Sequence, residues 1–281
     1  MITMKQYKTP LRYPGGKSRA CKKMEPFFPD LRDYDAYYEP FLGGGSVALH
    51  ITKKYPKLKI IVNDLYEPLY NFWLQLQVNG DYVHKELQEL KSRFPDRGSA
   101  RGLFLDAKEK LYDLEISDKD RAVCFYIINK CSFSGLTESS SFSAQASDAN
   151  FSMRGINKLP VYSELIKDWY ITNVDYYHLL GDKEKTFVYL DPPYDIKDNL
   201  YGKKGSIHKK FDHDNFAKNC EIYNSEMLIS YNSDQLVKDR FEDWNCAEFD
   251  LTYTMRSVGE YMRNQRTRKE LLLFNYNTGV F

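Results

Sequence analysis

Apolar residues recur with strand-like spacing at both ends of the 281-residue chain and with helical spacing in its middle. Short apolar runs bounded by turn residues predict strands; these runs are 37–41, 59–64, 169–174, 186–190, 227–231, 248–253 and 271–276. Residues 46–51 have the pattern of a helix. The chain therefore begins with a strand-loop-helix-strand unit of about 30 residues, the size of half a nucleotide-binding fold.

The middle of the chain is of a different kind. Residues 66–128 are mostly helical by their pattern, with Leu69, Phe72, Trp73 and Leu76 at helical spacing. Residues 132–157 are rich in Ser, Asn and Gly, which predicts a long polar loop. We expect an α/β fold with one doubly wound sheet, formed by residues 1–70 and 166–281. A mainly helical insertion, residues 71–165, would interrupt it.

The composition argues against a zinc-binding, secreted or membrane-spanning protein. Hydrophobic residues make up 42% of the chain, enough for a core, and the net charge is +1. The five cysteines are scattered without a Cys-x-x-Cys pair, which argues against a zinc site and for reduced thiols. No apolar run has the length of a membrane span, and the start of the chain lacks the apolar core of a signal peptide. We expect a cytoplasmic protein without metal or membrane attachment.

Basic residues gather in three clusters on this nearly neutral chain. Residues 1–24 hold seven Lys and Arg and no acid, and two further clusters lie at 197–210 and 256–269. Each cluster alone is consistent with an ordinary solvated loop. Together they predict one positive face of the kind that binds nucleic acid.

The first candidate site is the glycine loop at Glu39-Pro40-Phe41-Leu42-Gly43-Gly44-Gly45, between a predicted strand and helix. Glycines let a ligand approach the backbone, and Asp64 ends the next strand, where an acid can accept hydrogen bonds from ribose hydroxyls. The loop lacks the patterns of dinucleotide-binding and phosphate-binding loops. A ligand with a ribose but no pyrophosphate, such as S-adenosylmethionine, fits these residues, although a plain structural turn fits the glycines alone.

The second candidate is Asp191-Pro192-Pro193-Tyr194, which follows the apolar strand 186–190. An exocyclic base amine is a poor nucleophile, because its lone pair is delocalised into the ring. Asp191 and the backbone carbonyl of Pro192 can each accept a hydrogen bond from one N–H group of the amine. The two prolines fix the backbone that carries this carbonyl. Tyr194 can stack on a base that has left the duplex. The motif predicts methylation of a base amine.

The third candidate is Tyr13-Pro14-Gly15-Gly16-Lys17, which lacks the spacing and the preceding strand of a phosphate-binding loop. It offers an aromatic ring and a cation that could close over a cofactor, and Lys17 can pair with a carboxylate.

Together these motifs resemble the Dam-like family of DNA adenine methyltransferases of bacteria and phages, over residues 10–75 and 165–278. The resemblance implies a Rossmann-like core, S-adenosylmethionine as cofactor and a target-recognition domain before Asp191. Asp175 or Tyr176 would lie near the adenine ring of the cofactor. The full set of cofactor contacts that we expect is Tyr13, Lys17, Glu39, Phe41, Gly43, Gly45, Asp64, Asp175 and Asp191.

The insertion departs from the family pattern. Residues 129–136 keep its outline, but residues 137–150 are Ser-rich and hold no Lys or Arg to read bases. The recognition sequence therefore cannot be inferred. The candidate DNA contacts are Lys130, Arg154, Lys158, Lys203 and Lys204, each equally consistent with solvated charge.

We expect a site-specific enzyme that flips adenine out of double-stranded DNA and methylates its N6 amine, with no obligatory protein partner. Alternatives within the same chemistry are the cytosine amine and RNA adenine. A glutamine-amide methyltransferase is disfavoured because Asp191 stands where that chemistry usually has Asn. A catalytically silent DNA-binding relative is the alternative from another class.

Overall fold

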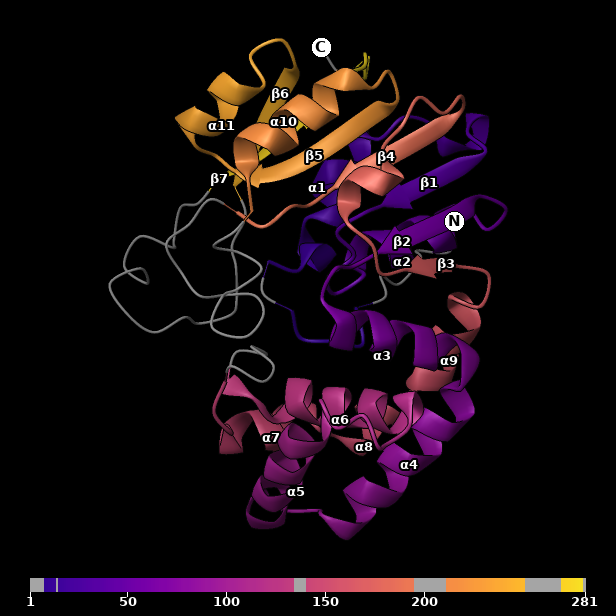
Figure 1. The fold of residues 1–281 in the computed structure, drawn as a ribbon, viewed down its shortest axis with the longest axis vertical. Coiled ribbons are helices and arrows are strands. Elements are labelled where there is room, and N and C mark those ends of the chain that lie inside the picture. The colour runs from indigo at the N-terminus through magenta and orange to yellow at the C-terminus, as the bar shows by residue number, and fades with distance from the viewer. Residues whose placement is uncertain (1–7, 14, 134–139, 195–210, 251–268, 280–281) are drawn as a thin grey trace.

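A seven-stranded sheet forms the centre of the computed structural model, which describes residues 8–13, 15–133, 140–194, 211–250 and 269–279. The strand order is β3-β2-β1-β4-β5-β7-β6, with β7 antiparallel to both of its neighbours and the first five strands parallel (Figure 1). The strands are β1 (Ala36–Glu39), β2 (Lys59–Asn63), β3 (Tyr170–Thr172), β4 (Thr186–Leu190), β5 (Glu226–Asn232), β6 (Asn245–Asp250) and β7 (Lys269–Phe274). The predicted α/β fold and all seven predicted strands are confirmed, with ends that differ by a few residues.

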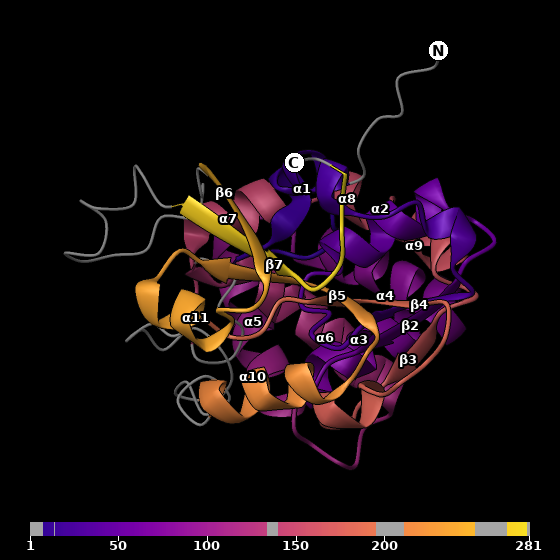
Figure 2. The ribbon, with the colours of Figure 1, turned by 90° about the horizontal axis from the view of Figure 1, so that it is seen from above.

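Helices cover both faces of the sheet, so its central strands are apolar on both sides. In β4, Val188 and Leu190 belong to a core shared with α10 (His213–Ile222) and α11 (Gln235–Arg240). Phe187 and Tyr189 point the other way, into a core shared with α1 (Cys21–Met24) and α2 (Ser46–Lys54). Figure 2 shows these two layers on opposite sides of the sheet.

The middle of the chain forms a helical layer beside the sheet (Figure 1). Its helices are α3 (Glu67–Val78), α4 (Gly80–Arg93), α5 (Arg97–Lys110), α6 (Asp118–Cys131), α7 (Ala144–Asn150), α8 (Met153–Ile156) and α9 (Leu159–Leu165). Helix α6 is buried from Ala122 to Cys131, and α3, α4, α5 and α7 pack around it. Phe125 of α6 lies in the same core as Tyr37 of β1, and the expected boundary after residue 70 falls inside α3.

The predicted long polar loop at 132–157 is wrong in part, because α7 and α8 lie within it. Ser143 and Ser152 cap these two helices, since their side chains accept hydrogen bonds from the backbone N–H of Ala146 and Gly155. Serines that resemble loop residues in sequence thus begin short helices. The sequence also did not predict α9, α10 and α11, each of ten residues or fewer.

Within the described ranges, no helix has the length and apolarity needed to cross a membrane. The same ranges contain no group of three His, Cys, Asp or Glu side chains placed to hold a metal ion. The five cysteines are free thiols, and Cys246 alone among them is exposed.

Candidate active site

The glycine loop between β1 and α2 has the backbone that glycine favours. Gly43 and Gly45 have φ angles of +50° and +67°. A Cβ atom on Gly45 would lie 2.7 Å from the ring of Trp73, whose Nε1 donates to the carbonyl of Gly43 at 3.2 Å. Glycine is therefore favoured at these positions both by the positive φ angles and by the close packing of Trp73 from α3.

Asp64 follows β2 and joins the glycine loop to the start of α3. Its Oδ2 accepts the N–H of Gly43 at 2.8 Å, and its Oδ1 accepts the N–H of Tyr66 at 2.9 Å. Burial raises the pKa of Asp64 to about 6, against the lowering effect of these two bonds. Since each carboxylate oxygen can accept a second hydrogen bond, the group can still bind ligand hydroxyls.

The N-terminal segment lies over the glycine loop. A Cβ atom on Gly43 would lie 2.9 Å from Cε1 of Tyr13, so the tyrosine ring covers this glycine. The backbone N–H of Arg12 donates to Oδ1 of Asn129 at 2.9 Å, and Nδ2 of Asn129 donates to the carbonyl of Arg12 at 2.6 Å. This reciprocal pair ties the segment to α6. Pro14 lies outside the described residues.

Lys17 and Asp191 form a buried ion pair at the end of β4. The Nζ of Lys17 donates to both carboxylate oxygens of Asp191, at 2.8 and 2.9 Å, and to the hydroxyl of Tyr194 at 2.7 Å. Lys17 is 3% exposed, whereas Asp191 is 23% exposed and reaches the pocket. Burial raises the pKa of Asp191, while the charge of Lys17 opposes that shift. The structure brings together these three residues, which stand 177 positions apart in the sequence at most.

Three further residues belong to this cluster, although sequence reasoning assigned them no role. Glu270 accepts a hydrogen bond from Tyr194 at 2.6 Å and lies 3.2 Å from Nζ of Lys17. Ser230 donates to Oδ1 of Asp191 at 2.9 Å and pairs with the hydroxyl of Tyr189 at 2.8 Å. A polar residue inside an apolar strand, as at 230 and 270, is the signal that could have found them.

Aromatic rings close one end of the site. The ring centroid of Phe41 lies 5.3 Å from that of Tyr176 and 5.8 Å from that of Phe211. Asp175 caps the short helix that begins at Tyr176. Phe211, Asp212 and Asn215 were not predicted, because Phe211 is one aromatic among many and only the fold brings it here.

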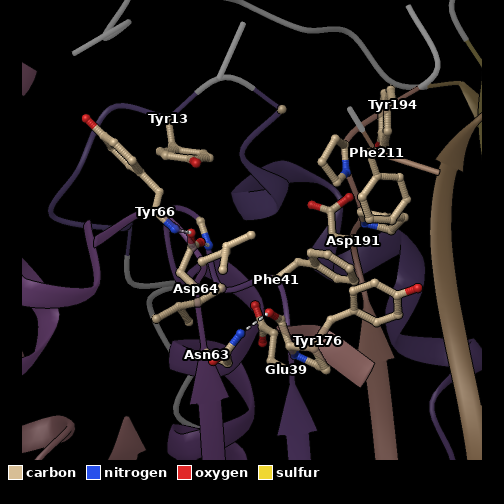
Figure 3. Close-up of a pocket in the computed structure, with 18 of the residues that line it drawn as sticks. Tyr13, Glu39, Phe41, Asn63, Asp64, Tyr66, Tyr176, Asp191, Tyr194 and Phe211 are labelled. Atoms are coloured by element: carbon tan, nitrogen blue, oxygen red, sulfur yellow. Dashed lines mark hydrogen bonds between the residues drawn. The ribbon is translucent and has the colours of Figure 1, made fainter. Parts of the chain in front are cut away.

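The glycine loop, Asp64, Lys17, the Asp191 motif and the aromatic rings of Phe41, Tyr176 and Phe211 line one pocket of about 490 Å³. Figure 3 shows Tyr13, Asp64 and Tyr66 on one side and Asp191, Tyr194 and Phe211 on the other. Eleven of the twelve residues that we predicted for catalysis or cofactor binding line the pocket. They are Tyr13, Lys17, Glu39, Phe41, Gly43, Asp64, Asp175, Asp191, Pro192, Pro193 and Tyr194. The exception is Gly45, which turns the loop behind the pocket.

The charge of the pocket is unusual for a nucleotide site. Lys17 is the sole basic side chain among its described lining residues. Against it stand five carboxyl groups, those of Glu39, Asp64, Asp175, Asp191 and Asp212. Glu39 accepts a hydrogen bond from Tyr37 at 2.6 Å, and its burial raises its pKa well above the usual range. Such a lining disfavours a pyrophosphate and favours a ligand that carries positive charge.

The candidate DNA contacts differ in accessibility. Arg154 and Lys158 are exposed. Lys130 is 8% exposed, with its Nζ 5.2 Å from the ring centroid of Tyr126. Burial, with a smaller effect from the charge of Arg12, lowers the pKa of Lys130 to about 7. Lys203 and Lys204 lie outside the described residues.

Comparison with known proteins agrees with the geometry. The chain is 26% identical to the type II methyltransferase M.MjaIII of Methanocaldococcus jannaschii, over 95% of this chain and 98% of that protein. It is 19% identical to the type II methyltransferase M.CviBI of Paramecium bursaria Chlorella virus NC1A, over 95% and 98% of the two chains. It is 22% identical to the modification methylase StsI of Streptococcus sanguinis, of which it spans 44%.

The family model of D12 class N6 adenine-specific DNA methyltransferases matches residues 13–255, which include the glycine loop, Asp64 and the Asp191 motif. This match covers most of the chain. The protein belongs to the family of D12 class N6 adenine-specific DNA methyltransferases.

Proposed function

We propose that the pocket of about 490 Å³ binds S-adenosylmethionine for transfer of its methyl group to adenine in double-stranded DNA. The observation that carries this proposal is the lining itself, in which Asp64 and Asp191 face one space with five carboxyl groups and one lysine. Bound there, S-adenosylmethionine supplies an electrophilic methyl group on a positively charged sulfur. Asp64 would hold the ribose hydroxyls, with Tyr13, Phe41 and Asp175 completing the site.

The chain's own residues prepare the amine. Asp191 is anchored through Oδ1 by Ser230 and through both oxygens by Lys17, so its carboxylate has a fixed direction. An N–H of the adenine amine would donate to Asp191, and the other N–H to the backbone carbonyl of Pro192. Two acceptors localise the nitrogen lone pair and stabilise the positive charge that develops on it.

Access of the base requires that it leave the helix, because the amine is paired inside duplex DNA. The ring of Tyr194 is held at the pocket by its hydroxyl and packs near Tyr231, with 5.8 Å between ring centroids. We assign the stacking surface for the flipped base to Tyr194.

We assign target recognition to the helical insertion, residues 71–165, and duplex contacts to Arg154, Lys158, Lys203 and Lys204. We do not assign such a contact to Lys130, because its side chain is buried. We place the reaction in the cytoplasm of a bacterial or phage-infected cell, where its DNA substrate lies. The insertion contributes no residue to the described lining of the pocket, which supports a role outside the chemical step.

Two variants test the proposed site separately. Asp191→Ala is expected to abolish methyl transfer to DNA oligonucleotides while DNA binding persists, because the amine loses its side-chain acceptor. Asp64→Ala is expected to weaken S-adenosylhomocysteine binding measured by calorimetry. Turnover retained in the first variant, or unchanged affinity in the second, would disprove the corresponding assignment. Sequencing of DNA from cells that express the protein identifies the methylated site.

A further inference from the structure

Glu270 contacts the cluster of Lys17, Asp191 and Tyr194 from β7, which is antiparallel to the strand beside it. It stands at the start of β7, where it pairs with Asn232 at the end of β5. Because β7 is antiparallel to β5, its first residues lie at the edge of the sheet where the parallel strands end. The side chain is 1% exposed, which is rare for a carboxylate unless it is paired.

The contacts of Glu270 place Lys17 between two carboxylates. Oε1 of Glu270 lies 3.2 Å from Nζ of Lys17, whose other contacts include both oxygens of Asp191 at 2.8 and 2.9 Å. The same Oε1 accepts the hydroxyl proton of Tyr194 at 2.6 Å. With two ionised carboxylates and one ammonium, these three charged groups carry a net charge of −1.

We infer that Glu270 is a positioning residue for methyl transfer, which holds Lys17 and Tyr194 beside Asp191 and keeps the cluster negatively charged. The inference rests on the proposed role of Asp191 as the acceptor for the amine. A neutral residue at 270 would leave Lys17 to neutralise Asp191 alone, and the carboxylate would then be a weaker acceptor.

That negative charge would stabilise the transfer step. The amine nitrogen forms a bond to the methyl carbon as the bond from that carbon to sulfur breaks, and the positive charge passes from sulfur to nitrogen. A proton then leaves the nitrogen for water. A net negative cluster beside the nitrogen stabilises the charge as it arrives, and the low exposure of Glu270 limits screening by water.

The pH dependence of the rate provides a readout that a purely structural role would not change. Burial raises the pKa of Asp191, Lys17 lowers it, and the negative charge of Glu270 raises it. Glu39 from β1 and Tyr189 from β4 are further titratable groups that interact with this carboxylate. The hydroxyl of Tyr194 shares the Nζ of Lys17 with it. Loss of the charge at 270 should therefore lower the pKa of Asp191.

The test is single-turnover methyl transfer with saturating DNA and S-adenosylmethionine, measured across the acid limb of the pH–rate profile. Glu270→Gln should lower the plateau rate about 10- to 100-fold. This is less than the roughly 100- to 1,000-fold loss of a donor that contacts the transition state directly, because Glu270 acts through Lys17 and Tyr194. It should also move the acid limb to lower pH. Glu248→Gln is the matched control, because Glu248 on β6 pairs with Lys238 and Lys269 away from the pocket. It should retain the wild-type rate and profile.

Glu270→Asp separates charge from reach. Its shorter side chain should lower the rate while the acid limb stays at the wild-type pH, and this holds whether or not Glu270→Gln folds. A wild-type rate in both variants, or the same acid limb in Glu270→Gln as in the wild type, would overturn the inference. Asp191→Asn distinguishes the two levels: if it retains turnover, the proposed role of Asp191 fails rather than that of Glu270 alone.

Discussion

The position of the Tyr13 ring over Gly43 can be tested by the substitution Gly43→Ala, which adds one methyl group at this glycine. In Gly43→Ala the new Cβ would lie 2.9 Å from Cε1 and 3.2 Å from Cδ1 of Tyr13, well inside the usual carbon–carbon separation. The φ of +50° adds a second cost, about 1–2 kcal/mol for a residue with a Cβ. Overpacking against the ring adds roughly 1–3 kcal/mol. The free energy of unfolding should fall by about 2–5 kcal/mol in total.

A double-mutant cycle separates these two costs. In a Tyr13→Ala background the ring is absent, so Gly43→Ala should cost only the backbone strain, about 1–2 kcal/mol. Urea denaturation of the four proteins gives the difference directly. Gly102→Ala is the control, because no atom lies within 4 Å of its added Cβ inside α5; it should stabilise the protein by up to about 1 kcal/mol. An equal cost of Gly43→Ala in both backgrounds would refute the placement of the ring.

Three other changes have defined outcomes. Affinity for S-adenosylhomocysteine should rise with pH through about 6, since the ionised carboxylate of Asp64 is the better acceptor of hydroxyl protons, and calorimetry should show no such rise in Asp64→Asn. The pKa of Lys130 is about 7 in the folded chain and higher in the unfolded chain, so unfolding between these values binds a proton and the free energy of unfolding should increase from pH 7 to pH 10. Urea denaturation of Lys130→Met should lack this increase. The same pH dependence in the variant as in the wild type would contradict the prediction. Lys17→Met leaves Glu270 buried without its ammonium, and thermal denaturation should show a loss of about 3 kcal/mol, whereas a wild-type midpoint would speak against the buried pair.

The central strands of the sheet could be predicted because they are buried on both faces. All five residues of β4 are buried, so the strand appears in the sequence as a continuous apolar run that ends at Asp191. The carboxyl ends of parallel strands share one edge, and that rule was enough to expect Asp64 and Asp191 in one site. The same rule did not predict Glu270, because this residue lies at the start of β7 and not at the end of a strand. The antiparallel pairing of β7 with β5, which the sequence does not reveal, brings it to the same edge.

Lys130 shows a second limit of sequence reasoning. Lys130 was a candidate DNA contact because it belongs to residues 129–136, which keep the outline of the family pattern, and because lysines are usually exposed. Helix α6 is instead the centre of the helical layer, so its last turn is buried together with Lys130. Short helices such as α7 and α8 were missed for a related reason, since seven and four residues give too few turns for a clear period.

The reciprocal hydrogen bonds of Asn129 have a consequence for protein engineering. The amide of Asn129 binds the backbone N–H and carbonyl of Arg12, so these two hydrogen bonds do not depend on the side chain at position 12. The guanidinium of Arg12 adds a separate bond, from Nη1 to the carbonyl of Ser132 at 2.8 Å. Chimeras that exchange the helical insertion between family members would therefore stay fastened to the segment bearing Tyr13 and Lys17 wherever the donor supplies an asparagine at this point of α6. An insertion without that amide would fold beside the sheet yet leave the segment over the pocket without this anchor.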